Sequence, residues 1–284
     1  MIYRYWDQTE LDRQMSARST VPDIMPFVQA YARESAVMRA TLPCKLNVAY
    51  GPSEPERMDI FPARTADAPI FVFLHGGYWR LLDSADSSFM AKTFVEAGAV
   101  CVAVNYALAP SVSLDEIVRQ CRASIAYVWH HAQEFGGDRA RIHVCGSSAG
   151  GHLVGMMLAP DWQADYGLPP DCIQSACALS GLFDLEPVQL SNVNEWMKLD
   201  AEAAKRLSPL QHLPSAPVPL IVSYAPNETE EFKRQSEIYA SACVAKSCAV
   251  EVVLEPGTNH YDLPLRLMDR ASALTRVTLK IMGL

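Results

Sequence analysis

The stretch that decides the fold is Ile142-His143-Val144-Cys145-Gly146-Ser147-Ser148-Ala149-Gly150-Gly151-His152. The apolar run from Ile142 to Cys145 predicts a strand, and the run from His152 to Leu158 predicts a helix. Between them lies Gly-x-Ser-x-Gly, whose small residues allow a sharp strand-to-helix turn. We therefore expect Ser148 at the apex of that turn, with its side chain exposed and its backbone strained. The N–H of Ala149 then points to where an oxyanion would form.

Gly-x-Ser-x-Gly alone is a weak signal, because ordinary strand-to-helix turns use the same residues. Here a second motif lies upstream, where His75-Gly76-Gly77 directly follows the apolar run Ile70 to Leu74. Glycines keep a loop free of side chains, so that its backbone can approach a substrate carbonyl. Together the two motifs favour a catalytic site over two unrelated tight turns.

The composition favours one large domain and argues against several classes of function. The chain has 284 residues, half of them apolar, and nothing in the composition divides it. A net charge of −8 argues against nucleic acid and anionic membranes as partners. No apolar run reaches the roughly 18 residues that span a bilayer, and the N-terminus lacks a signal-peptide core. The eight cysteines form no Cys-x-x-Cys pair, so we expect a reduced, cytoplasmic protein without a metal site or cofactor.

The hydrophobic pattern predicts strands that alternate with helices after an N-terminal arm of short helices, residues 1–45. This arm either packs on the core or forms part of a lid, and both interpretations stay open. The expected strands are 46–50, 57–61, 70–74, 99–104, 142–145, 173–179, 220–224 and 249–254, and the expected helices are 113–135, 152–158, 232–244 and 265–282. Continuous apolar strands of this kind predict a mainly parallel sheet covered by helices on both faces, in a single domain over 1–284. Residues 183–217 interrupt the alternation, and we expect them to form a cap.

A serine nucleophile needs a base, usually histidine, and a carboxylate that orients the base. Of the seven histidines, His260 alone lies in a loop after the last expected strand, so we predict that it is the base. The loop after the strand that ends at Tyr224 offers three carboxylates. Glu228 lies in the loop itself, whereas Glu230 and Glu231 are expected in the first turn of the next helix, where the helix dipole favours acidic residues.

The order of these motifs resembles that of the α/β-hydrolase superfamily. The His-Gly-Gly-x-Trp form of residues 75–79, with Asn105-Tyr106-x-Leu-Ala-Pro110 and Glu231 to Ser236, resembles its arylformamidase (kynurenine formamidase) and esterase branch. The resemblance covers about residues 45–284. It implies the α/β-hydrolase fold and a catalytic triad of Ser148, Glu228 and His260, with Glu231 as the alternative acid. It also implies an oxyanion hole made by the N–H groups of Gly77 and Tyr78, joined by that of Ala149.

We therefore expect a serine hydrolase whose substrate is a small-molecule acyl amide or ester, preferably an aryl formamide of the N-formylkynurenine type. The alternatives are a carboxylesterase for short acyl esters or lactones and a non-catalytic ligand-binding protein on the same fold. Aromatic residues near the loops, Trp79, Tyr106 and Tyr261, are predicted to bind substrate, although each is as compatible with a place in the core. Whether the chain is a monomer or a homodimer stays open.

Overall fold

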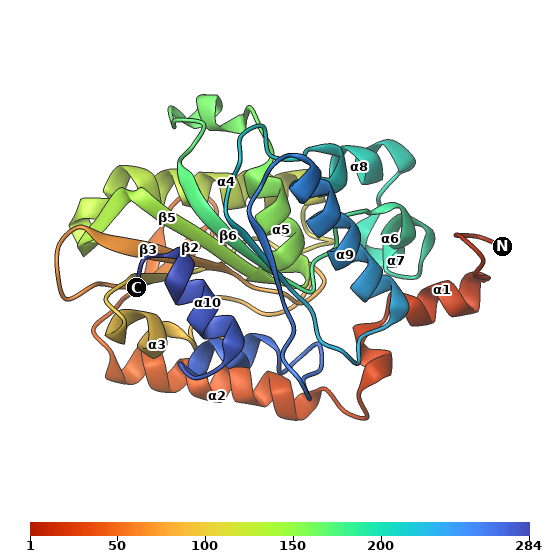
Figure 1. Cartoon of the computed structure of the whole chain (residues 1–284), viewed down its shortest axis with the longest axis horizontal. Helices are drawn as coiled ribbons and strands as arrows, with labels where there is room; N and C mark the ends of the chain where they lie inside the picture. The colour runs from red at the N-terminus through yellow and green to blue at the C-terminus, as the bar shows by residue number, and fades with distance from the viewer.

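The structure is a computed structural model that describes residues 1–284. The chain forms one eight-stranded sheet between two layers of helices (Figure 1). The strands are β1 (Lys45–Ala49), β2 (Arg57–Phe61), β3 (Ala68–Leu74), β4 (Val100–Val104), β5 (Gly137–Ser147), β6 (Ile173–Leu179), β7 (Leu220–Ser223) and β8 (Val250–Val253). Their spatial order is β1-β2-β4-β3-β5-β6-β7-β8. Strand β2 is antiparallel to β1 and β4, and the other pairs are parallel. The predicted α/β class is therefore confirmed.

Each face of the sheet has its own layer of helices and its own core. One face carries α2 (Met25–Thr41), α3 (Ala91–Glu96) and α10 (Ala273–Ile281), and the other carries α4 (Leu114–His131), α5 (Ala149–Leu158) and α9 (Glu230–Ala245) (Figure 1). Alternate residues of β3 enter the two cores, because side chains on a strand point to opposite faces. No helix has both the length and the apolar character needed to cross a bilayer.

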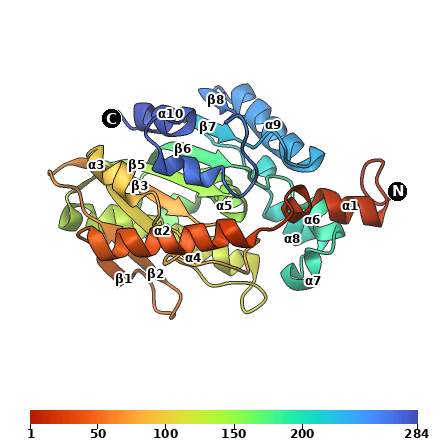
Figure 2. The same ribbon diagram turned by 90° about the horizontal axis from the view of Figure 1, so that it is seen from below.

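The predicted excursion over residues 183–217 contains three short helices, α6 (Glu186–Leu190), α7 (Asn194–Met197) and α8 (Ala201–Arg206). Helix α1 (Gln8–Gln14) of the N-terminal arm lies beside them at one end of the molecule (Figures 1 and 2). Two polar contacts join these segments. Gln8 Nε2 donates to the carbonyl of Leu190 at 3.0 Å, and the N–H of Asn192 donates to Asp12 Oδ1 at 2.8 Å.

Two predicted elements differ from the structure. The N-terminal arm does contain helices, but α2 has 17 residues and is not short. The closing helix expected over 265–282 is two segments, a 3-10 helix (Pro264–Met268) and α10. Local polar contacts separate them, because Asp269 Oδ1 accepts from the N–H of Ala271 at 2.8 Å and Ser272 Oγ accepts from the N–H of Thr275 at 3.1 Å. Such side-chain contacts compete with helical hydrogen bonds and begin a new helix at a cap.

Candidate active site

The turn after β5 holds Ser148 in a strained conformation, with φ of 58° and ψ of −116°. The two flanking glycines permit the close approach of strand and helix. A Cβ on Gly150 would lie 2.0 Å from the carbonyl oxygen of Leu74, and one on Gly146 would lie 2.4 Å from the carbonyl oxygen of Gly150. Such backbone strain costs on the order of 1–3 kcal/mol and persists only where the surroundings enforce it. Here β5 and α5 enforce it, and they present Ser148 to a cavity.

A buried carboxylate and a buried histidine meet beside this turn. His260 Nδ1 lies 2.9 Å from Glu228 Oε1, and both side chains are almost fully buried. Because Nδ1 is engaged by Glu228, Nε2 is the nitrogen left to exchange a proton with a substrate or nucleophile. Ser180, the residue after β6, donates its hydroxyl to the same Glu228 oxygen at 2.5 Å. Ser180 was not predicted, although a polar residue at the carboxyl end of a parallel strand is a usable signal.

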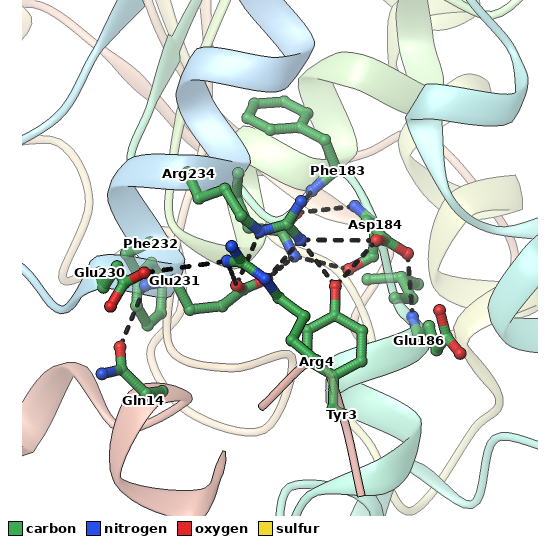
Figure 3. Close-up of polar contacts among 12 residues, drawn as sticks. Tyr3, Arg4, Gln14, Phe183, Asp184, Glu186, Glu230, Glu231, Phe232 and Arg234 are labelled. Carbon is green, nitrogen blue, oxygen red and sulfur yellow. Dashed lines mark hydrogen bonds and ion pairs between the residues drawn. The ribbon is translucent and has the colours of Figure 1, made fainter. Parts of the chain in front are cut away.

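The two competing carboxylates are engaged elsewhere. Figure 3 shows Glu231 pointing toward arginines, and its fully buried carboxylate accepts two hydrogen bonds from Arg234 at 2.7 and 2.8 Å. Arg4 adds an ion pair with Glu231 at 3.9 Å. Glu230 is exposed and accepts a hydrogen bond from the hydroxyl of Tyr5. Of the three candidates, Glu228 is therefore the carboxylate that contacts His260.

The loop after β3 presents backbone N–H groups to the same cavity. Gly77 has φ of 96°, and a Cβ there would lie 2.3 Å from the carbonyl oxygen of Leu81, so that only glycine fits. Tyr78 follows in the left-handed region, with φ of 51°. The N–H groups of Gly77 and Tyr78 donate to no carbonyl of the chain. Ala149 is the first residue of α5, where N–H groups also lack partners within the helix.

A cavity of about 580 Å³ lies beside these groups. Its walls include Ser148, His260, Gly77 and Tyr78, together with residues of the N-terminal arm and of the excursion. The arm contributes Met15, Ser16, Ala17, Arg18, Ile24, Val28 and Tyr31, and the excursion contributes Asn192, Val193 and Trp196. The arm therefore packs on the core and also contributes to the cavity wall, because Met15 is fully buried in the core and also lines the cavity.

The aromatic residues divide into those that line the cavity and those that lie behind it. Tyr261 lines it, but Trp79 and Tyr106 do not. The indole N–H of Trp79 donates to His152 Nδ1 at 3.3 Å, and the Tyr106 hydroxyl donates to the carbonyl of His75 at 2.7 Å. Both side chains are buried beneath the glycine loop. We therefore correct their predicted role, because they support the loop rather than line the cavity.

Three other buried histidines have structural roles in the core. Burial lowers the pKa of each of His75, His143 and His152 from 6.5 to about 4. His75 stacks on Tyr106, with ring centroids 4.1 Å apart, and His143 Nδ1 lies 2.7 Å from Ser175 Oγ. All three are neutral at pH 7, so they add no charge to the core.

Because of these buried histidines, we expect the folded protein to lose stability in acid. Since the folded pKa is about 4 and the unfolded pKa about 6.5, the unfolded chain binds more protons between these values, and stability falls as the pH falls. At pH 5, each histidine then costs up to ~2 kcal/mol of unfolding free energy relative to pH 7. Urea unfolding of His143→Gln at both pH values should show a smaller loss than the wild type. The exposed His130→Gln serves as the control, and equal losses for all three proteins would contradict the prediction.

The fold and the site together define an α/β-hydrolase. The sheet is eight-stranded and mainly parallel, a strained serine turn follows β5, and a carboxylate–histidine pair lies at the same cavity. The family model BD-FAE matches residues 58–227. A kynurenine formamidase of Salmo salar is 36% identical and aligns with 98% of this chain and 97% of its own length, and one of Danio rerio is 33% identical over 98% and 96%. The crystal structure of a candidate thioesterase from Silicibacter sp. TM1040 is 26% identical, with a TM-score of 0.83 over 97% of this chain and 99% of that one. The chain belongs to the BD-FAE family, in the arylformamidase and esterase branch of the α/β-hydrolases. The predicted fold and hydrolase class are thus confirmed.

Proposed function

We propose that this hydrolase removes a formyl or similarly small acyl group from an aryl amine, through an acyl-enzyme on Ser148. The observation that carries the proposal is the contact of 2.9 Å between His260 and Glu228 at the cavity that Ser148 and the glycine loop share. The full-length similarity to proteins named kynurenine formamidase supports an aryl formamide of the N-formylkynurenine type as substrate.

The proposed reaction begins when Ser148 Oγ attacks the acyl carbonyl and its proton passes to His260 Nε2. The carboxylate of Glu228 stabilises the resulting imidazolium. The N–H groups of Gly77, Tyr78 and Ala149 stabilise the oxyanion. The C–N bond then breaks, and His260 returns the proton to the leaving amine. Water, deprotonated by His260, attacks the acyl-enzyme, the bond between Ser148 Oγ and the acyl carbon breaks, and His260 returns the proton to Ser148. With a formyl group the products are the aryl amine and formate.

The cavity contains features that suit an aromatic leaving group. Trp196 and Tyr261 lie on its wall, and aromatic rings provide a stacking surface for an aryl group. Arg80 also lines the cavity, with its guanidinium 4.0 Å from the centre of the Trp196 ring and with no acidic partner. A carboxylate on the leaving group would pair with this cation.

The acyl group is expected to be small. Tyr78 follows the glycine loop directly and lines the cavity, and its hydroxyl is fixed by a hydrogen bond to the carbonyl of Met15, so its ring cannot swing aside freely. We expect kcat/KM to be highest for formyl or acetyl and to fall steadily toward octanoyl when the aryl leaving group is kept constant. The series is measured with aryl esters, and the formamide of the same aryl group is measured beside them.

The same series decides between the two hydrolase candidates. A carboxylesterase for short acyl esters or lactones would use identical catalytic groups, and esters are intrinsically easier to cleave than amides. Ester turnover alone therefore decides nothing. If kcat/KM climbs from acetyl to octanoyl, or if esters are cleaved while the matched formamide is not, the formamidase proposal fails and the esterase replaces it.

A further inference from the structure

Three hydrogen bonds connect the first 31 residues to the three loops of the proposed active site. The hydroxyl of Tyr78 donates to the carbonyl of Met15, that of Thr229 donates to the carbonyl of Gln14 at 2.6 Å, and that of Tyr31 donates to the carbonyl of Tyr261. Each loop residue in these pairs directly follows a residue of the proposed mechanism. Tyr78 follows an oxyanion glycine, Thr229 follows the acid, and Tyr261 follows the base.

We propose that the N-terminal arm positions the catalytic loops, with Gln14 and Tyr31 as positioning residues that touch neither the substrate's reacting atoms nor the triad side chains. This inference rests on the proposed function, since it takes Ser148, Glu228 and His260 as the reacting groups. It assigns to residues outside the matched family region 58–227 a part in turnover itself.

On the acid side, Gln14 caps helix α9 from a distant part of the chain. Its buried side chain accepts a hydrogen bond from the N–H of Glu231 at 3.0 Å (Figure 3). The first N–H groups of a helix lack partners within the helix, so an external acceptor stabilises that turn. Thr229, the N-cap of α9, accepts from the N–H of Phe232 at 3.4 Å and donates to Gln14. Gln14 thus holds the peptide that follows Glu228.

On the oxyanion side, the carbonyl of Met15, the residue after Gln14, holds the glycine loop. Met15 is fully buried, so its carbonyl is a fixed point to which the Tyr78 hydroxyl is bound. Tyr78 itself is in the left-handed region, with φ of 51°. A non-glycine residue in that region costs on the order of 1–3 kcal/mol unless its surroundings hold it there. The hydrogen bond to Met15 supplies such a restraint, and the orientation of the Tyr78 N–H depends on it.

On the base side, Tyr31 of α2 holds the loop of His260. The Tyr31 ring stacks on Phe89, with centroids 5.3 Å apart, which fixes the direction of its hydroxyl. Phe27, one turn earlier on α2, stacks on Tyr261 at 5.9 Å. Together these contacts place the backbone that follows His260. Removing the Tyr31 hydroxyl leaves both stacking contacts in place and frees only the carbonyl of Tyr261.

A separate cluster keeps the arm docked when one of these hydrogen bonds is removed. Arg234 of α9 donates to the Tyr3 hydroxyl at 2.8 Å, and Arg4 lies 3.9 Å from the buried carboxylate of Glu231 (Figure 3). One hydrogen bond contributes only about 1 kcal/mol to stability, whereas a shift of about 1 Å in a catalytic group costs ~100-fold in rate. Single substitutions should therefore affect turnover far more than folding.

The test compares Tyr31→Phe and Gln14→Met with the wild type. We expect kcat to fall about tenfold in each variant and about a hundredfold in the double variant, while KM changes less than about twofold. Active-site titration with an acylating aryl ester should still count a full complement of sites. Tyr5→Phe is the matched control, because it removes an exposed hydroxyl of the same arm that binds Glu230 and no catalytic loop. Its kcat should equal that of the wild type.

The outcomes separate this inference from the function on which it rests. If Ser148→Ala retains turnover, the proposed function fails. If Ser148→Ala is inactive while Tyr31→Phe and Gln14→Met keep wild-type kcat, the positioning role fails alone. It also fails if the variants lose titratable sites in proportion to their rate, because that result means partial unfolding, or if KM alone rises, because that result means direct substrate binding.

Discussion

Ser148→Ala is expected to lower kcat by about 10⁶, the scale of loss when a nucleophilic serine is removed from a triad. The alanine enzyme should also fail to react with an organophosphate, which labels an activated serine covalently. Alanine fits the site, because it removes only an oxygen and leaves the turn between β5 and α5 intact. Circular dichroism and the midpoint of urea unfolding should therefore match the wild type. Turnover of an aryl ester and mass spectrometry of the labelled protein provide the two measurements.

Ser147 provides the matched control for this substitution. It is the last residue of β5 and lines the same cavity, but it lies outside the strained position that the glycines create. Ser147→Ala should keep covalent labelling and most of its activity. If instead Ser148→Ala is labelled normally and Ser147→Ala is not, the nucleophile is Ser147 and the proposed role of the turn is wrong.

The sheet could be predicted from sequence because its strands are buried on both faces. Such strands have short, continuous apolar sequences. The expected run 70–74, for example, lies within β3, Ala68–Leu74. The closing helix was predicted wrongly because its apolar periodicity continues across Asp269 and Ser272. Those two side chains bind nearby backbone N–H groups instead, and periodicity carries no information about that competition.

The local parts of the site could be predicted, whereas contacts between distant segments could not. Ser148 and the glycine loop are recognisable because backbone geometry requires small residues at fixed spacing. Ser180 lies 48 residues from the carboxylate that it contacts, and Gln14 lies 217 residues from the N–H that it caps, so no local pattern indicates either pair. The direction of the Trp79 side chain was equally hidden, since it depends on a positive φ of 57° at that residue.

The choice between Glu228 and Glu231 shows how the surroundings give two similar carboxylates different tasks. The two residues are three positions apart and both are buried. Glu231 lies against two cations, Arg234 and Arg4, which hold it away from the base. Glu228 contacts His260 and Ser180, and one of its oxygens has no hydrogen-bond partner in the protein. Chemistry alone does not distinguish them, but the placement of the arginines does.

Glu228→Gln is therefore expected to lower kcat by about 10⁴, because the amide leaves His260 without the charge that stabilises its protonated form and fixes its tautomer. Glu231→Gln should have the opposite profile. It removes the anion that Arg234 and Arg4 share, although each arginine keeps a second acidic partner. Because both arginines are partly exposed, we expect a loss of about 1–3 kcal/mol of stability. The folded fraction of that variant should nevertheless keep kcat within about tenfold of the wild type. Urea unfolding and kcat per titrated active site separate the two effects. Near-normal kcat in Glu228→Gln, together with a loss of several orders of magnitude per active site in Glu231→Gln, would transfer the role of the acid to Glu231.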